Sequence, residues 1–282
     1  MTYFTFLIVF PGVPIVLLSL LNEWDRRRGR LQPKALQSLP PGRVIALLCL
    51  IAFVYSTPWD NYLVATRVWW YDPVLVTGIV IGFVPIEEYI FFILLPIFTG
   101  LFLLFLQKRM VFTAKQPHNL RLRIWATCIA SAIWVTSLVI LNLTLSDSRY
   151  KPFTYLSLEL AWALIPIIAQ LAFGADILWR HRRTVLVGIV LSTLYLSATD
   201  VIALSEGTWV IDPDQSLQWL IGGILPIEEL VFFGLVNTLV VIGITLMLAE
   251  ESRLRVEALG RYTILRPLVK RLQNISKKSV DE

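Results

Sequence analysis

Long apolar runs separated by short polar segments dominate this sequence of 282 residues. A helix needs about 20 apolar residues to cross about 30 Å of bilayer hydrocarbon, and seven runs approach or exceed that length. The predicted spans are residues 3–21, 44–63, 75–106, 124–145, 155–179, 184–203 and 217–249. With 56% hydrophobic and 16% charged residues, the chain is predicted to be an all-α polytopic membrane protein with seven transmembrane helices. No basic segment precedes the first run and no small-residue cleavage site follows it, so we expect a retained helix.

Two of these runs, 75–106 and 217–249, are longer than a bilayer requires. Pro85 and Pro226 lie about a third of the way along them. We therefore expect these spans to tilt, to kink at the proline, or to begin with an interfacial or re-entrant segment.

The basic residues are distributed unevenly between the two ends of the predicted helices. Of the 25 Lys and Arg residues, all but Arg67, Arg149 and Lys151 fall in alternate loops or in the C-terminal tail. By the positive-inside rule, the N-terminus lies outside and the C-terminus in the cytoplasm of a multi-pass protein of the cell membrane. The net charge of +5 follows from this asymmetry and does not indicate nucleic-acid binding. The tail is expected to be either an amphipathic segment on anionic lipid or a mostly disordered extension.

The first three spans are repeated in the last three. The matched residues are Asp60 with Asp200, Trp69 with Trp209, Asp72 with Asp212, Pro73 with Pro213, Tyr3 with Tyr155, and Pro14 with Pro166. The extra fourth span gives both three-helix units the same orientation, so a pseudo-twofold axis along the membrane normal should relate two parallel repeats. The predicted divisions are a first repeat (1–110), a linker with the fourth helix (111–150), a second repeat (151–250) and a basic cytoplasmic tail (251–282).

A matched pair of acids lies in each repeat. Residues 85–92 read PIEEYIFF, and residues 226–233 read PIEELVFF. An acidic side chain inside a bilayer costs several kcal/mol unless it is protonated, paired or hydrated, so such acids indicate function. The candidate catalytic residues are Glu87, Glu88, Glu228, Glu229, Asp60 and Asp200.

Counting along the helices from the basic loops places these acids together in the outer half of the bilayer. We expect a layer of carboxyl groups converging from the second, third, sixth and seventh spans. Two neighbouring carboxyl groups seldom ionise together, so one can hold a proton at neutral pH beside an ionised partner. Such a pair is a general acid next to a general base.

The acid motif also has a purely structural interpretation. Proline is favoured at the start of a helix, and Glu in the first turn complements the helix dipole, so each motif would begin a span at the outer interface. The apolar segments 74–84 and 217–225 count against this, because they flank the acids on their other side. Asp72-Pro73 and Asp212-Pro213 are better explained as helix N-caps.

Aromatic residues accompany the acids and would stabilise a carbocation through cation–π attraction. The candidate substrate-binding residues are Phe91, Phe92, Phe232, Phe233, Trp59, Trp69, Trp209 and Tyr89. Ordinary helix packing is the alternative for the phenylalanines, and an interfacial aromatic belt is the alternative for the tryptophans. The sequence contains no dinucleotide or phosphate-binding motif, no DDxxD-type diphosphate site and no metal-ligand spacing. We therefore expect no cofactor, no metal and an uncharged apolar substrate.

These motifs resemble those of the membrane-integral lycopene cyclases, whose hallmark is Pro-x-Glu-(Glu/Asp) in each half. The residues that carry the resemblance are 57–61, 69–73 and 85–92 in the first half, and Asp200, Trp209 and 225–229 in the second. The chain resembles a single-chain fusion of two subunits that occur separately in actinobacteria, without the phytoene synthase domain of the fungal versions.

The resemblance implies a cofactor-independent isomerisation that converts the linear ψ-ends of lycopene into β-ionone rings, giving γ-carotene and then β-carotene. A neutral Glu would protonate C2, the C5=C6 bond would attack the C1 cation, and a carboxylate would remove a proton from C6. The implied partners are lycopene or a similar linear carotenoid and the lipid bilayer. Other carotenoid-pathway enzymes, or a second copy of the chain, are further candidates.

Other functions stay open at this point. A proton-coupled transporter or channel would also duplicate three helices and place acids in the membrane, although the apolar cytoplasmic halves of spans three and seven disfavour it. A non-catalytic carotenoid-binding relative, or a cyclase acting on C50 carotenoids or forming ε-rings, fits the same motifs. The sequence also leaves open whether one or both ends react, which Glu is the acid, and whether there is one shared site or two.

Overall fold

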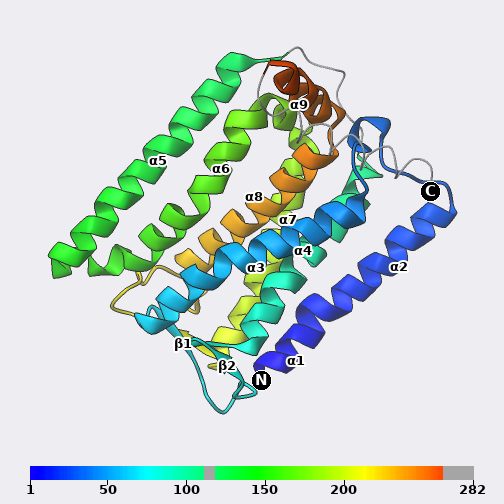
Figure 1. Cartoon of the computed structure of the whole chain (residues 1–282). Helices are drawn as coiled ribbons and strands as arrows, with labels where there is room; N and C mark the ends of the chain where they lie inside the picture. Colours follow the sequence, from blue (N-terminus) through cyan, green and yellow to red (C-terminus); the bar gives the residue numbers. More distant parts are fainter. Residues whose placement is uncertain (111–117, 263–282) are drawn as a thin grey trace.

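Seven membrane-length helices form the bundle in the computed structural model, which describes residues 1–110 and 118–262 (Figure 1). The helices long and apolar enough to span a membrane are Tyr3–Arg27, Lys34–Ala65, Ile86–Gln107, Leu120–Ser146, Ser148–Arg180, Arg182–Ser205 and Ile227–Leu248. The predicted all-α polytopic membrane protein with seven transmembrane helices is thereby confirmed. Residues 111–117 of the predicted linker and 263–282 of the predicted tail lie outside the described residues.

The first half contains α1 (Tyr3–Leu7), a π-helical turn (Ile8–Gly12), α2 (Val13–Arg27), a 3₁₀ turn (Lys34–Leu36), α3 (Pro41–Ala65), β1 (Trp69–Tyr71), β2 (Val80–Ile81), β3 (Val84–Pro85) and α4 (Ile86–Gln107). Next come α5 (Leu120–Ser146), a 3₁₀ turn (Ser148–Phe153), α6 (Thr154–Arg180), α7 (Arg182–Ser205), β4 (Trp209–Ile211), β5 (Leu220–Ile221), β6 (Leu225–Pro226), α8 (Ile227–Leu248) and α9 (Glu250–Tyr262). The π-helical turn surrounds Pro11, whose missing N–H cannot continue the α-helical hydrogen bonding of the first span.

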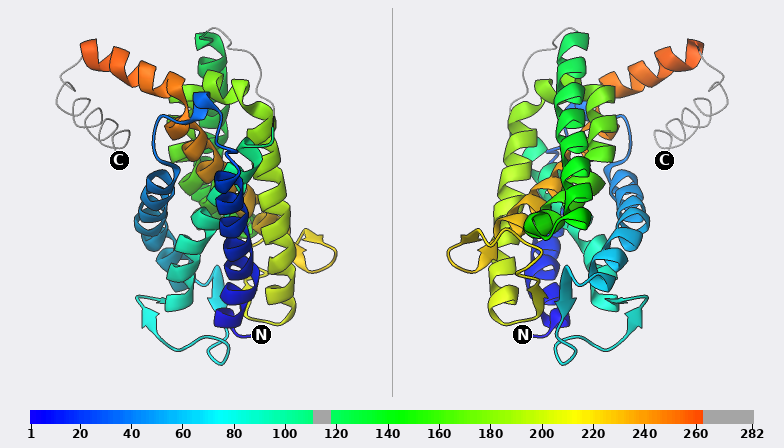
Figure 2. Two further views of the ribbon diagram at one scale, coloured as in Figure 1. Left: turned by 90° about the vertical axis from the view of Figure 1, so that its right-hand side faces the viewer. Right: turned by 90° about the vertical axis from the view of Figure 1, so that its left-hand side faces the viewer.

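The third and seventh helices begin later than the apolar runs that predicted them. Pro85 and Pro226 are N-cap residues, and α4 and α8 start at the next residue. The preceding apolar segments form two short antiparallel hairpins, β2–β3 and β5–β6, which project to opposite sides of the bundle (Figure 2). The glycines with positive φ in these segments are Gly78, Gly82, Gly222 and Gly223. Because glycine adopts positive φ without steric cost, these residues turn the chain and prevent a continuous helix.

Corresponding residues of the two predicted repeats make corresponding backbone contacts. The strands β1 and β4 pair antiparallel, with the partners Trp69 with Ile211, Trp70 with Val210, and Tyr71 with Trp209. This register is twofold-symmetric about its central pair. The N–H of Tyr3 donates to the carbonyl of Leu75 at 2.8 Å, and the N–H of Tyr155 donates to that of Gln215 at 3.0 Å. The start of the first helix of each predicted repeat is therefore fixed in the same way.

The helices α4 and α8 form the centre of the bundle. Of their most apolar windows, 56% and 61% are buried, compared with 11% for α5, which lies at one edge (Figure 1). A buried polar network joins the centre to α7. The hydroxyl of Thr99 donates to the Asn237 amide oxygen at 2.7 Å, and the Asn237 amide donates to the Thr193 hydroxyl at 3.3 Å. Hydrogen bonds of this kind stabilise helix contacts in lipid, where hydrophobicity provides no driving force between helices.

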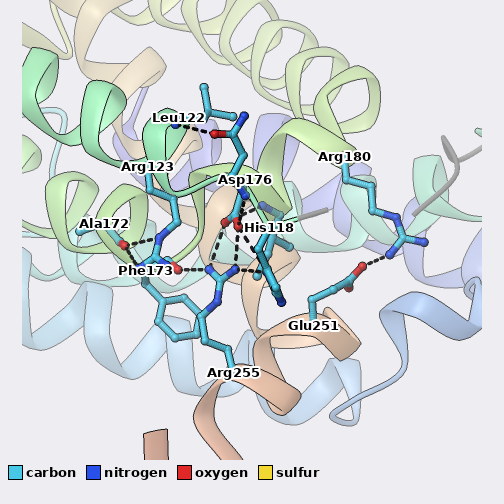
Figure 3. Close-up of polar contacts among 11 residues, drawn as sticks. His118, Leu122, Arg123, Ala172, Phe173, Asp176, Arg180, Glu251 and Arg255 are labelled. Carbon is cyan, nitrogen blue, oxygen red and sulfur yellow. Dashed lines mark hydrogen bonds and ion pairs between the residues drawn. The ribbon is translucent and has the colours of Figure 1, made fainter. Parts of the chain in front are cut away.

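The described part of the predicted tail, α9, lies at the end of the bundle opposite the strands (Figure 1). Arg255 donates to the carboxylate of Asp176 at 2.7 and 3.0 Å, and Arg180 pairs with Glu251 (Figure 3). Up to residue 262 the tail is therefore a helix docked on the bundle through ion pairs. A mostly disordered extension therefore does not describe this part, and contact of this helix with anionic lipid stays a prediction.

A kink in α6 creates the surface on which α9 docks. The kink lies at Gly174, where φ is −152° and ψ is 28°. The nearby carbonyls of Ala172 and Phe173 accept hydrogen bonds from the guanidinium groups of Arg123 and Arg255, respectively (Figure 3). Two arginines from outside the helix thus satisfy backbone groups near the kink.

Candidate active site

The two acid pairs lie in the first turns of α4 and α8, at the end of the bundle that carries β1, β2 and the N-terminus (Figure 1). All four side chains are buried, and none is more than 8% exposed. The structural interpretation of the motif is therefore correct about where the helices begin. It does not explain why all four acids face the protein interior.

The first acid of each pair binds backbone. Oε1 of Glu87 accepts the N–H of Thr77 at 2.6 Å, and Oε1 of Glu228 accepts the N–H of Leu217 at 2.6 Å. Thr77 and Leu217 lie in the segments that lead into the two hairpins. Through these hydrogen bonds each first acid anchors a hairpin segment to the helix that follows it.

The second acid of each pair binds tyrosine. Tyr3 and Tyr71 both donate their hydroxyl hydrogen bonds to Oε2 of Glu88, the second at 3.0 Å. Tyr155 donates to Oε1 of Glu229 at 2.7 Å. Tyr3 and Tyr155 are matched residues of the repeat, whereas Tyr71 is matched by Ile211. The two carboxyl groups therefore have related but unequal environments.

Glu88 and Glu229 line the same cavity. Its cavity volume is about 50 Å³, and Asp200 is its third acidic residue. The predicted aromatic residues in its wall are Trp69, Phe91, Trp209, Phe232 and Phe233. We call this cavity the acid chamber. Residues from both halves of the chain line this one cavity.

The matched aspartates Asp60 and Asp200 are buried close to the second acids. Trp209 donates its indole N–H to Oδ1 of Asp200 at 3.0 Å. The carboxyl of Asp60 interacts electrostatically with Glu88, and its oxygens have no hydrogen-bond partner within the described part of the chain. The expected convergence of acids from α3, α4, α7 and α8 is thus observed.

The phenol of Tyr71 lies outside the membrane-spanning helices, next to these acids. Burial raises the pKa of Tyr71 well above its usual value, and the nearby Asp60 and Glu88 carboxyl groups add to the shift. The phenol therefore stays protonated and remains a hydrogen-bond donor to Glu88.

An apolar groove adjoins the acid chamber. It has a volume of about 330 Å³ between α3, α4, α6 and α8, and Trp59 and Phe92 are predicted substrate-binding residues in its wall. Phe91 and Phe232 line both the groove and the chamber. Their rings form the boundary between an acidic, aromatic pocket and a long apolar surface.

Three predicted residues lie elsewhere. Tyr89 lines neither of these two cavities, because its hydroxyl donates to the Ile81 carbonyl at 2.8 Å and accepts from Asn61 at 2.9 Å. Asp72 and Asp212 do not cap helices. Each accepts the backbone N–H two residues later, at 2.9 and 3.0 Å, within the turn that follows β1 or β4. The prediction of helix N-caps is wrong because a turn, not a helix, follows each Asp-Pro pair.

Sequence reasoning missed Tyr3, Tyr71, Tyr155 and Glu159 as members of the site. The match between Tyr3 and Tyr155 was visible in the repeat, and Glu159 is an acid within a predicted span, which is itself a signal for function. What the sequence lacked was the packing of α1 and α6 against the acids. Within residues 1–110 and 118–262, no group of three or more His, Cys, Asp or Glu side chains is placed to hold a metal ion.

Comparison with known proteins agrees with these motifs. The lycopene cyclase family model matches residues 31–106 and 152–248. The lycopene beta-cyclase of Halobacterium salinarum is 33% identical over 247 residues, which cover 87% of this chain and 95% of that protein. The bifunctional lycopene cyclase/phytoene synthase of Blakeslea trispora is 36% identical over 200 residues, or 69% of this chain and 32% of that protein. No solved structure matches the chain. The chain belongs to the lycopene cyclase family of membrane-integral enzymes.

Proposed function

We propose that this enzyme is a lycopene β-cyclase that converts linear ψ-ends into β-ionone rings by acid–base chemistry without a cofactor. The observation that carries the proposal is the acid chamber, in which Glu88 and Glu229 from the two halves face one aromatic-walled cavity. A relative at 33% identity that bears the name lycopene beta-cyclase supports lycopene as the substrate.

The groove would bind the polyene of a linear carotenoid, and the acid chamber would bind its terminal group. The long polyene is apolar and uncharged, and it fits a groove lined by apolar and aromatic side chains. Its terminal group would pass between Phe91 and Phe232 into the chamber, beside the two carboxyl groups. The acids are thereby presented only to the end of the molecule, where ring closure occurs.

The chemistry needs one proton given and one proton taken. One chamber carboxyl protonates C2 of the terminal double bond, which leaves a cation at C1. The C5=C6 electron pair then forms the C1–C6 bond, and the positive charge moves to C5. The other carboxyl, as the carboxylate, removes the proton from C6, and the C5=C6 bond forms again. The faces of the surrounding aromatic rings stabilise the cation, and their bulk excludes water that would trap it.

A single chamber has a consequence for the second ring. Because both acids serve one cavity, the two ends of a carotenoid must react one after the other. The monocyclic product leaves the chamber and re-enters with its other end. We therefore expect the monocyclic carotene to be a free intermediate that accumulates early in the reaction.

The charge distribution supports an orientation in the cell membrane. Arg67, Arg149 and Lys151 belong to the end that carries the strands, whereas the other basic residues of segments 1–110 and 118–262 belong to the opposite end. We infer that the acid chamber lies on the outer side and that α9 lies in the cytoplasm. Labelling of single cysteines at the exposed positions Gly78 and Leu254, with Cys49 and Cys128 replaced, by a membrane-impermeant reagent on intact cells tests this, since only the first should react.

Expression in a non-carotenogenic bacterium that makes lycopene tests the function. The wild-type chain should convert lycopene to a monocyclic and then a bicyclic carotene with β-rings, as resolved by chromatography of extracted pigments. The matched control is Glu88→Gln, which should be present in the membrane in equal amount and leave lycopene unchanged. Unchanged lycopene with the wild-type protein in the membrane would contradict the proposal, and ε-ring products would correct the ring type.

A further inference from the structure

Glu159 is a buried acid that the first half of the chain lacks. It lies in α6 with none of its side chain exposed, and among the residues described no basic group pairs with its carboxyl, which lies beside the Tyr155 hydroxyl. The repeat that matches Tyr3 with Tyr155 and Pro14 with Pro166 matches Glu159 with Leu7. Burying an acid without a basic partner is unfavourable, and a leucine fits the corresponding position, so packing does not explain this residue.

Tyr155 connects Glu159 to the acid chamber. Residues four apart on a helix share a face, so Tyr155 and Glu159 lie next to each other on α6. The Tyr155 hydroxyl donates to Oε1 of Glu229 at 2.7 Å and also interacts with the Glu159 carboxyl. The carboxyl groups of Glu228 and Glu229 are the other acidic neighbours of Glu159. Glu229 lines the chamber, whereas Glu159 does not, so Glu159 acts on the chamber through Tyr155.

The two chamber acids differ in what surrounds them. Within the described residues Glu88 accepts two tyrosine hydroxyls, and donors of this kind stabilise the ionised form of a carboxyl group. Glu229 accepts one, and Glu159 beside it opposes a second negative charge. Asp60 lies near Glu88, and Asp200 lies near both Glu88 and Glu229, so the aspartates do not favour a charge on Glu88. The tyrosine hydrogen bonds to Glu88 and the Glu159 carboxyl beside Glu229 favour Glu88 as the carboxylate and Glu229 as the protonated acid before reaction.

We propose, on the basis of the cyclase function proposed above, that Glu159 is a positioning residue that restores the proton of Glu229 through the Tyr155 hydroxyl after each cyclisation. Glu229 is then the proton donor to C2 and Glu88 the proton acceptor from C6. In the restoring step Glu159 gives its proton to the Tyr155 oxygen while the Tyr155 hydroxyl proton passes to Glu229. Tyr155 is unchanged, Glu159 becomes a carboxylate, and Glu229 is again the acid. Glu88 then releases the proton it took from C6, and Glu159 takes up one, so the cycle neither gains nor loses protons.

Replacing Glu159 in the full-length protein separates this role from a structural one. Glu159→Gln and Glu159→Leu, the second copying the first half, should lower kcat for lycopene in proteoliposomes by about 10- to 100-fold. The KM should not change, because Glu159 does not line the groove or the chamber. The thermal stability should stay equal or rise, because a buried acid has been removed. Glu159→Asp, which keeps the ionisable group, should recover part of the lost rate.

A double-mutant cycle tests the path through Tyr155, with the matched Tyr3 as control. If Glu159 and Tyr155 act in one path, adding Glu159→Gln to Tyr155→Phe should lower kcat no further. Adding Glu159→Gln to Tyr3→Phe should multiply the two losses. Unchanged kcat in both Glu159 variants, lost activity that follows lost stability, or equal coupling to both tyrosines would overturn the inference. Failure of the wild-type enzyme to cyclise lycopene would instead refute the proposed function, so the two failures are distinguishable.

Discussion

The two halves of the molecule share a scaffold and differ where they face the acid chamber. Glu87 and Glu228 accept backbone N–H groups at the same distance of 2.6 Å, and the two hairpins occupy matched places. Inside the chamber, Tyr71 on the Glu88 side corresponds to Ile211 on the other. Leu7 in the first half corresponds to Glu159 in the second. The two halves therefore make the same backbone contacts, and they differ in the side chains around the two second acids.

This difference indicates how one duplicated unit can provide two chemical roles. A symmetric pair of carboxyl groups in one cavity would have no preferred donor or acceptor. Under the proposal above, the tyrosine hydroxyls at Glu88 favour its role as proton acceptor. The additional acid Glu159 beside Glu229 favours the role of Glu229 as proton donor. The groove shows the same asymmetry, since Trp59 in its wall corresponds to Thr199 in the second half. The predictions below test where the halves remain equivalent and where they do not.

The largest effect should separate the first acid of each pair from the second. Glu88→Gln and Glu229→Gln should each lower kcat by about 100- to 10,000-fold, because each removes a proton donor or acceptor from the chamber. Glu87→Gln and Glu228→Gln are the matched controls. A glutamine oxygen can still accept the backbone N–H, so these variants should retain activity within about 10-fold and lose about 1 kcal/mol of stability. Pigment analysis and thermal unfolding of the purified variants measure both effects, and cyclisation that survives replacement of all four acids would refute an acid–base mechanism at these residues.

The second effect concerns the tyrosine that the second half lacks. Tyr71→Phe removes one of the two hydroxyls that bind Glu88, and kcat should fall about 10-fold, as expected for about 1.4 kcal/mol from one hydrogen bond to a charged group. Burial raises the pKa of Tyr71, so in the wild type the phenol stays protonated up to at least about pH 9. The alkaline limb of the pH–rate profile should therefore be the same in the wild type and Tyr71→Phe. An alkaline limb that disappears in the variant would show that Tyr71 itself titrates.

Much of the fold could be predicted from the apolar pattern, because a bilayer requires helices of a fixed length. The seven spans and the all-α class follow from that requirement. The hairpins could not be predicted, because the segments before Pro85 and Pro226 are as apolar as the helices themselves. Glycines at positive φ interrupt the apolar runs before the helices begin, and the sequence pattern does not show which glycines adopt that conformation. The docking of α9 depends on a kink at Gly174 that hydropathy does not reveal.

The candidate acids could be predicted because charges in apolar runs are conspicuous, but their division of labour could not. Adjacent residues on a helix point about 100° apart, so Glu87 and Glu88 reach different partners. Which one faces the chamber depends on contacts with Thr77 in the preceding turn segment and with Tyr3, which is distant in sequence. Tyr89 was predicted to bind substrate from its place in the motif. Its side chain points instead toward Asn61 and the first hairpin.

A smaller effect should distinguish the two hairpins. Oδ1 of Asn61 in α3 accepts the N–H of Phe83 at 2.9 Å, and its amide donates to Tyr89 at 2.9 Å. The corresponding residue of the second half is Val201, which can make neither contact. Asn61→Val should therefore lower the free energy of unfolding by about 1–2 kcal/mol, measured by thermal unfolding in detergent. Asn61→Asp keeps the acceptor for Phe83 and should cost less. Equal stability of Asn61→Val and the wild type would mean that the two hairpins are held equally well without this contact.

The smallest effect should come from the turns that follow α3 and α7. Arg67 adopts a positive φ of 62°, and its counterpart Gly207 has a φ of 70°. A side chain in this region costs about 1–2 kcal/mol, part of which is offset because glycine loses more backbone entropy on folding. The space around Gly207 is open, so Gly207→Arg should cost only this conformational difference, less than about 1 kcal/mol. Arg67→Gly should leave stability unchanged or raise it by a similar amount. The Arg67 guanidinium carbon lies 6.0 Å from the centre of the Trp70 ring. A loss of stability in both variants would show that Arg67 contributes through this side chain and that the two turns differ in more than backbone strain.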